Sequence, residues 1–229
     1  MSQPSNVVAV AQGLTSDAFH QILDLAIDGK GKLPGAKVAA KNLLARHGDP
    51  ETAIDWLVRE HIALAGGQGF ATNWGGFFVS LVTIPANIAA AAFVQARLVA
   101  SIAHLRGYEL SDRRVRSAIL MVMLGPTAGE ALVSNGQLPS SPLAVATAPV
   151  FDAKLDGQIS RALLDRAMNQ LSGKRLGVWV GKRIPFVGGG VGAVVDGWAT
   201  HLIARLAQES FPSRRPRLNR WTKDEPQTT

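Results

Sequence analysis

Residues 62–96 read IALAGGQGFATNWGGFFVSLVTIPANIAAAAFVQA and contain no charged side chain over 35 consecutive positions. Five glycines lie in the first half of this stretch, and Pro85 precedes an alanine-rich second half. A second apolar stretch, residues 184–204, carries only Asp196 and His201 as ionisable side chains. Each stretch contains at least the number of residues, about 20, that a membrane-spanning helix needs. The fold therefore depends on where these two segments are buried.

The whole chain has 229 residues, which is enough for one domain with its own core. Hydrophobic residues make up 47% and charged residues 18%, and the mean hydropathy is +0.12, so the composition favours burial or contact with a bilayer. The absence of cysteine excludes a disulfide framework and a thiolate nucleophile or metal ligand. We expect a flexible N-terminus at 1–13, a helical domain at 14–211 and a basic, disordered tail at 212–229.

The chain has a net charge of +7, from 24 Lys and Arg against 17 Asp and Glu. The positive charges are scattered and match no nucleic-acid-binding motif, so we expect no nucleic-acid partner. The first 13 residues are uncharged and lack both the basic region and the long apolar core of a secretion signal. We therefore expect a cytoplasmic protein.

Helix start and stop signals recur along the chain, and no alternating strand pattern persists. Asp49 and Asp112 are predicted N-caps, and Gly48 and Gly107 are predicted to end helices. Residues 173–183 are ambiguous, with helix favoured over strand. The sequence predicts an all-α, single helical-bundle domain in which two glycine-rich apolar helices pack centrally. We expect loops at 33–35 and 135–149, and helices at 17–27, 36–47, 50–65, 85–106, 115–124, 152–171 and 185–211.

The glycines of the second apolar stretch have two interpretations. Gly188, Gly190 and Ala193 match the G-x-G-x-x-A pattern of dinucleotide sites, but that pattern needs a preceding buried strand, which Pro185 and its basic neighbours interrupt. Gly188 and Gly192 also form G-x-x-x-G, which lets two helix backbones approach closely. We favour helix packing and predict no cofactor.

Asp196 lies on the small, apolar side of its predicted helix, where an unpaired carboxylate is costly. On the other long helix, Arg97, Ser101 and His104 share one side, so we hypothesise that Asp196 pairs there with Arg97 or His104. A structural ion pair is favoured over a catalytic site. If the chain is an enzyme, the candidate catalytic residues are Asp196, His104 and His201. The histidines lack metal-ligand spacing, so we predict no metal site. The candidate binding residues are Arg97, Ser101, Asn87, Gly188 and Gly192.

Two blocks of the chain resemble the EcsC protein family over roughly residues 20–211. The first block comprises residues 69–76 (GFATNWGG), 84–87 (IPAN) and 102–109 (IAHLRGYE), and the second is residues 181–188 (GKRIPFVG) followed by the glycine run and a helix ending in Ala207 and Phe211. The resemblance implies an all-α fold and a bacterial setting beside an ABC transporter or a secretion system. It supplies no catalytic residue. Some members have Asp where Asn87 stands here, so an acid-dependent role at that position is doubtful.

Together these observations predict a membrane-associated accessory protein of bacterial type that interacts with lipid or supports an ABC transporter or secretion system. A non-catalytic role is favoured over a hydrolase using Asp196 with His104 or His201, and a soluble helical interaction module is the second alternative. The expected partner is membrane lipid or a membrane protein, with a homo-oligomer left open. We expect a location peripheral to the membrane. Spanning by 75–96 and 184–204 is disfavoured but stays open, because Pro85, Asn87 and Asp196 oppose insertion.

Overall fold

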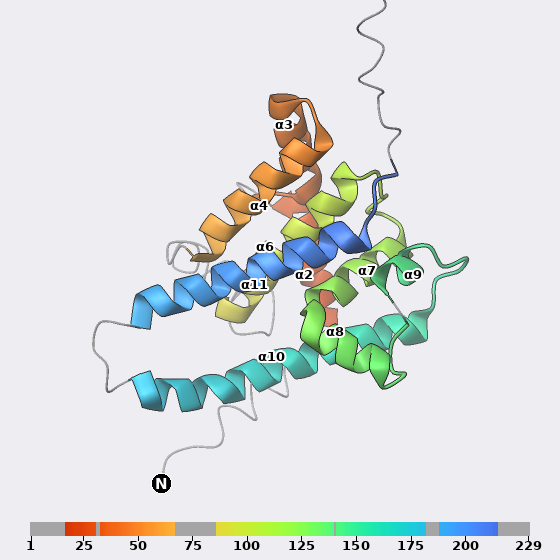
Figure 1. Cartoon of the computed structure of the whole chain (residues 1–229). Helices are drawn as coiled ribbons and strands as arrows, with labels where there is room; N and C mark the ends of the chain where they lie inside the picture. Colours follow the sequence, from red (N-terminus) through yellow and green to blue (C-terminus); the bar gives the residue numbers. More distant parts are fainter. Residues whose placement is uncertain (1–16, 31–32, 67–85, 140, 182–187, 215–229) are drawn as a thin grey trace, which may run out of the picture.

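A computed structural model describes residues 17–30, 33–66, 86–139, 141–181 and 188–214 (Figure 1). These residues form nine helices and one short hairpin, which confirms the predicted all-α fold. The helices are α2 (Asp17–Asp28), α3 (Ala36–His47), α4 (Pro50–Gly66), α6 (Ala86–Leu105), α7 (Arg113–Met123), α8 (Gly125–Ser134), α9 (Pro142–Ala146), α10 (Ala153–Gly181) and α11 (Gly188–Ser210).

Local capping signals placed several helix ends correctly. The backbone N–H of Thr52 donates to Oδ2 of Asp49 at 2.9 Å, so Asp49 caps α4 as predicted. Asp112 caps α7 in the same way, by accepting a 2.9 Å hydrogen bond from the N–H of Arg114. Gly48 follows α3 with a φ of +72°, the left-handed conformation that glycine adopts without strain. Residues 173–181 continue α10, which confirms the preference for helix there.

Three segments differ from the predictions. Residues 33–35 were expected to be a loop, but Leu33–Pro34 forms strand β2, which pairs antiparallel with β1 (Gly29–Lys30). The predicted loop at 135–149 contains α9, because Ser141 caps it by accepting from the N–H of Ala144 and Pro142 suits its first turn. The third is α8, which no signal indicated. Gly125, with φ +74°, lets the chain turn between α7 and α8 through 108°.

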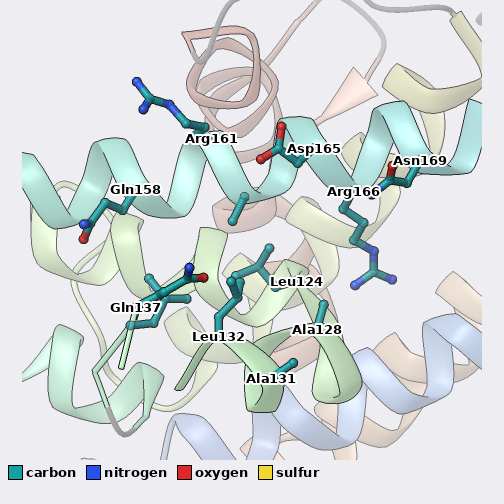
Figure 2. Close-up of a pocket in the computed structure, with 12 residues that line it drawn as sticks. Leu124, Ala128, Ala131, Leu132, Gln137, Gln158, Arg161, Asp165, Arg166 and Asn169 are labelled. Atoms are coloured by element: carbon teal, nitrogen blue, oxygen red, sulfur yellow. The ribbon is translucent and has the colours of Figure 1, made fainter. Parts of the chain in front are cut away.

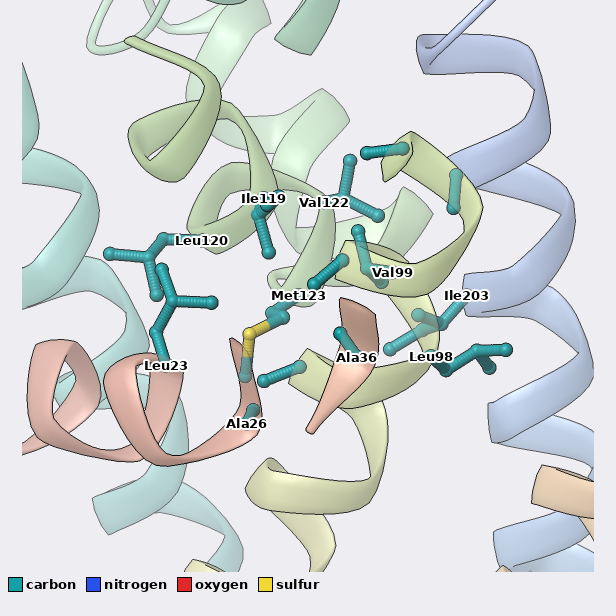
Figure 3. Close-up of a cluster of buried hydrophobic side chains, with 14 of the residues drawn as sticks. Leu23, Ala26, Ala36, Leu98, Val99, Ile119, Leu120, Val122, Met123 and Ile203 are labelled. Carbon is teal, nitrogen blue, oxygen red and sulfur yellow. The ribbon is translucent and has the colours of Figure 1, made fainter. Parts of the chain in front are cut away.

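The core is built around α6. This helix packs against α2, α3, α4, α7 and α11, so apolar neighbours cover nearly all of its sides. Figure 3 shows the arrangement, with Leu23 of α2, Val99 of α6, Ile119 of α7 and Ile203 of α11 converging on the same cluster. The predicted packing of the two glycine-rich helices is confirmed, since α11 contacts α6 as well as α4. The other side of α11 faces solvent, where Trp198 is 64% exposed.

The apolar sequence of α6, which is uncharged up to Ala96, is accounted for by this position. Among the described residues, the segment Ile88–Leu105 alone is a straight helix long and apolar enough to cross a membrane, with a mean hydropathy of 1.6. However, 78% of that segment is buried inside the protein. The bent pair α7–α8 is also long and apolar enough to cross a membrane if its two helices are counted as one span. The earlier half of the predicted span, residues 75–85, lies outside the described residues.

The end of α11 is fastened to the turn after α6. The guanidinium of Arg106 donates to the carbonyl oxygens of Gln208 at 2.7 Å and Phe211 at 3.2 Å, and also to Oε2 of Glu51 at 2.6 Å. A cation at a helix C-terminus is favourable because the helix dipole is negative there. The rings of Tyr108 and Phe211 meet edge to face, with centroids 5.0 Å apart. Residues 102–109 and the end of the second apolar helix, which the sequence analysis assigned to two separate blocks, therefore meet at this junction.

Candidate functional site

Arg97 lies at a buried junction between α6, α4 and the β1–β2 hairpin. Its Nε donates to the carbonyl oxygen of Pro34 at 3.0 Å, and its Nη1 lies 3.3 Å from Nε2 of His61. Its Nη2 is 4.0 Å from Oε1 of Glu60, which lies at the surface. Only 7% of Arg97 is exposed. Because Pro34, His61 and Glu60 all contact the guanidinium, Arg97 joins three segments that are distant in sequence.

His61 is held as a neutral imidazole by its surroundings. Its Nδ1 lies 2.8 Å from the carbonyl oxygen of Leu57, which can only accept, so Nδ1 carries the proton. Nε2 is then free to accept a hydrogen bond from Arg97. Burial, and next the charge of Arg97, lower the pKa of His61 from 6.5 to about 4. At neutral pH the pair is therefore one cation bonded to one neutral acceptor.

Of the predicted site residues on α6, Arg97 and Ser101 make structural contacts that bind other segments. Ser101 is fully buried and donates to the carbonyl oxygen of Ala36 at 3.2 Å, which ties α6 to the start of α3. Arg97 and Ser101 thus lie on the same side of α6, as predicted, and both bind backbone carbonyls. His104 lies half-buried near the end of α6. The side chain of Asn87 lies outside the described residues.

The structure does not bring the predicted site residues of α11 together into a catalytic group among the described side chains. His201 is exposed on the outer side of the helix. Gly188 and Gly192 lie in its first two turns, within the helical range. The side chain of Asp196 lies outside the described residues, so its pairing with Arg97 or His104 stays a prediction.

A second polar cluster joins α2, α7 and α10, and the sequence analysis missed it. Nε2 of His20 lies 3.1 Å from Oδ2 of Asp156 and 3.0 Å from the hydroxyl of Ser160. The hydroxyl of Ser117 is within hydrogen-bonding distance of both Oδ1 of Asp156, at 2.5 Å, and the carbonyl oxygen of Arg113. Burial raises the pKa of Asp156, but the hydrogen bonds from His20 and Ser117 outweigh burial and hold that pKa below its ordinary value.

This cluster has the residue types of a hydrolase but not the required geometry. A serine nucleophile needs a base nitrogen that accepts its proton, while the acid orients the other ring nitrogen. Here Asp156 and Ser160 share one nitrogen of His20, Nε2. A proton on Nε2 satisfies the carboxylate, and Ser160 is then left without a base. The cluster therefore acts as a polar connection between three helices.

Next to this cluster is an open pocket of about 270 Å³, lined by Asp17, His20, Arg113, Arg116, Phe151 and Asp156. Its cations already have partners, because Arg113 lies 3.7 Å over the ring of Phe151 and Arg116 pairs with Asp24. Within the described ranges, no group of three or more acidic or histidine side chains is placed to hold a metal ion.

A groove of about 780 Å³ lies between α8 and α10 (Figure 2). Leu124, Leu132 and Leu138 form its apolar floor together with alanines of both helices. Its remaining lining side chains are polar or charged. They are Gln137, Gln158, Arg161, Asp165, Arg166 and Asn169.

The guanidinium of Arg166 is the distinctive group of this groove. The residue is half-buried, and burial lowers its pKa. Among the described residues it has no hydrogen-bond or ion-pair partner. A Cβ atom built on Gly125 would lie 2.8 Å from Nη1 of Arg166, so the absence of a side chain at Gly125 makes room for the guanidinium.

A third feature is the outward face of α3, which we call the α3 face and define as Lys37, Val38, Lys41, Asn42, Ala45 and Arg46. All six residues are exposed, and α3 contains no acidic residue. Glu109 is close enough to Lys37 for that lysine to contribute to lowering the pKa of Glu109. By contrast, Lys41 and Arg46 form no ion pair with any described residue. Val38 adds an apolar side chain that is 48% exposed.

The α3 face could have been recognised from the spacing of its cations, whereas the groove could not. Lys37, Lys41 and Arg46 recur at roughly helical intervals in a segment correctly predicted as helix. The groove depends on α8, which the sequence did not predict. No family model, curated protein or solved structure matches this chain.

Proposed function

We propose that the protein is a non-catalytic accessory protein that binds to the surface of anionic membranes through the α3 face. The observation that carries this proposal is the concentration of exposed cations on a helix that has no acidic residue. Basic side chains near an anionic lipid surface contribute about 1 kcal/mol each. The exposed side chain of Val38 lies among the cations, where it can enter the headgroup region.

The position of α3 is compatible with this role. In Figure 1, α3 lies at one end of the molecule and α10 at the other, so a membrane can approach α3 without meeting the groove. The apolar residues of α6 are largely covered by other helices, so they do not need a bilayer to be buried. A peripheral location therefore accounts for the apolar sequence without a membrane span.

The absence of catalysis is part of the proposal. The hydrogen bonds of His61 and His20 belong to structural networks. The bacterial setting and the role beside an ABC transporter or secretion system rest on the resemblance to the EcsC family. Neither enters the argument for the α3 face.

Flotation with vesicles tests the proposal. The wild-type protein should float with phosphatidylglycerol vesicles and stay unbound with phosphatidylcholine vesicles, and binding should weaken as salt rises. The double variant Lys41→Glu/Arg46→Glu should bind at least about 30-fold more weakly, since two favourable contacts of about 1 kcal/mol each are lost.

A matched control changes the same net charge elsewhere. Lys154 and Arg205 are exposed on α10 and α11, away from the α3 face. The variant Lys154→Glu/Arg205→Glu should bind nearly as well as the wild type. Equal losses in the two variants would mean that the net charge alone drives binding. No binding of the wild-type protein to anionic vesicles would favour the soluble interaction module.

A further inference from the structure

The groove between α8 and α10 combines an apolar floor with the guanidinium of Arg166, which extends toward α8. Figure 2 shows Arg166 extending from α10 toward the side on which Ala128 of α8 lies, while Arg161 and Asp165 point to the opposite side of α10. The groove is lined by Arg161, Asp165 and Arg166, so its net charge is positive, and Arg166 is the cation that extends toward α8. Asn169 lies three residues after Arg166 on the same helix.

A half-buried guanidinium without a partner is an unfavourable arrangement. Most buried charges in proteins are paired, because removing a charge from water is costly. The chain has three acidic residues whose side chains lie outside the described residues, at positions 196, 224 and 225. None of the described acids neutralises Arg166, and Asp165, its neighbour in sequence, points away from it. An anion in the groove would supply the missing partner.

The remainder of the groove suits a hydrocarbon chain. Leu124, Ala128 and Leu132 provide an apolar surface next to Arg166, and Gln137 and Gln158 lie toward the other end. The volume of about 780 Å³ is within the range of about 300–1,000 Å³ that is typical of small-molecule sites. A ligand that matches both parts has a negative group at one end and an unbranched apolar chain.

We propose that this groove binds a single-chain anionic amphiphile of the fatty-acid class, with its carboxylate on Arg166 and its chain along Leu124, Ala128 and Leu132. Planar guanidinium groups bind carboxylates through two parallel hydrogen bonds, which fixes the headgroup end. The apolar floor contributes affinity in proportion to the chain length that it covers. This site goes beyond the proposed membrane binding and does not depend on the α3 face.

Isothermal titration calorimetry with dodecanoate below its micelle concentration tests the proposal in the absence of vesicles. The full-length wild-type protein should bind dodecanoate at one site. It should bind dodecyltrimethylammonium, which has the same chain and the opposite charge, at least about tenfold more weakly. Butyrate and inorganic phosphate provide the anion without the chain, and both should bind far more weakly than dodecanoate.

Two variants and one control locate the binding site. Arg166→Gln should weaken dodecanoate binding by about 10-fold or more, because a charge-assisted hydrogen bond is lost. Ala128→Phe should abolish it by filling the floor. Lys154→Gln removes one positive charge from an exposed position of the same helix that does not line the groove, so this variant should bind like the wild type. Circular dichroism and unfolding midpoints establish that each variant is folded.

The proposal is overturned if the wild-type protein does not bind dodecanoate, or if it binds the cationic amphiphile as tightly. Equal affinity of Arg166→Gln and Lys154→Gln would also overturn it, as would phosphate binding as tight as that of dodecanoate. The Lys41→Glu/Arg46→Glu variant should keep full dodecanoate affinity in solution. If that variant loses vesicle binding and keeps dodecanoate binding, the α3 face and the groove are independent binding sites.

Discussion

The buried His61–Arg97 contact predicts a specific loss of stability in mild acid. The pKa of His61 is lowered from 6.5 to about 4 in the folded protein, chiefly by burial and then by Arg97. Between these two pH values the unfolded chain binds a proton at His61 and the folded protein does not. The stabilisation from neutral His61 is therefore fully present above pH 6.5 and is lost as the pH falls toward 4.

The size of this effect follows from the same two values. One pH unit corresponds to 1.36 kcal/mol per proton, so the interval from 6.5 to about 4 amounts to about 3 kcal/mol of unfolding free energy. The side chain of His61 has no exposed surface, so solvent does not reduce this figure appreciably. A loss of about 3 kcal/mol is a large share of the stability of a typical domain.

Urea unfolding at intervals from pH 7 to pH 4 measures the effect in the wild type and in His61→Gln. The amide oxygen of the glutamine can accept from Arg97 in place of Nε2, but it does not titrate. All other ionisable groups are common to both proteins, so the difference between their curves isolates His61. The wild type should lose about 3 kcal/mol more than His61→Gln over this range.

The control is His47→Gln, which removes a half-buried histidine that stacks on Trp56 with ring centroids 5.2 Å apart. It should keep the pH dependence of the wild type. The reasoning would be refuted by parallel curves for the wild type and His61→Gln. An NMR titration that placed the pKa of His61 near 6.5 in the folded protein would refute it equally.

Three further predictions concern contacts that hold the helices together. Arg106→Ala should cost about 2–3 kcal/mol of unfolding free energy, because it leaves the carbonyl oxygens at the end of α11 without donors. Glu51→Gln, which changes the exposed partner of the same guanidinium, should cost under about 1 kcal/mol. Leu98→Ala should cost about 2–5 kcal/mol by creating a cavity in the fully buried face of α6, and equal urea midpoints for variant and wild type would contradict that packing. Ser117→Ala should cost about 1–2 kcal/mol at pH 7. The cost should shrink as the pH falls below the ordinary carboxyl pKa of 3.8 and through the lower pKa of Asp156 in the folded protein; a cost independent of pH would show that the hydroxyl does not stabilise the carboxylate.

The helices with local start and stop signals could be predicted from the sequence. Asp49 and Asp112 cap their helices through hydrogen bonds to residues two or three positions away, so a short window contains the whole signal. The glycine after α3 acts through its own backbone conformation. The helices α8 and α9 depend on a glycine turn and a serine cap inside segments rich in turn-forming residues, where propensity favours loop.

The candidate sites depended on contacts between distant residues, which periodicity does not specify. The shared side of Arg97 and Ser101 followed from helix geometry, but their partners at Pro34, Ala36 and His61 come from other segments of the chain. Likewise, the lack of a described acid beside Arg166 depends on where the fold places the acids of other segments. Helical spacing shows which residues share a face, and only the tertiary structure shows what that face meets.

The central claim, that the α3 face lies on anionic membranes, can be tested by site-specific fluorescence, because the chain contains no cysteine. An environment-sensitive fluorophore attached through Val38→Cys on α3, or through Lys154→Cys on α10, reports contact with lipid at either end of the molecule. With phosphatidylglycerol vesicles, the label at position 38 should shift to the blue and gain intensity, and the label at position 154 should not change. A response at position 154 alone, or no response at position 38, would contradict the claim.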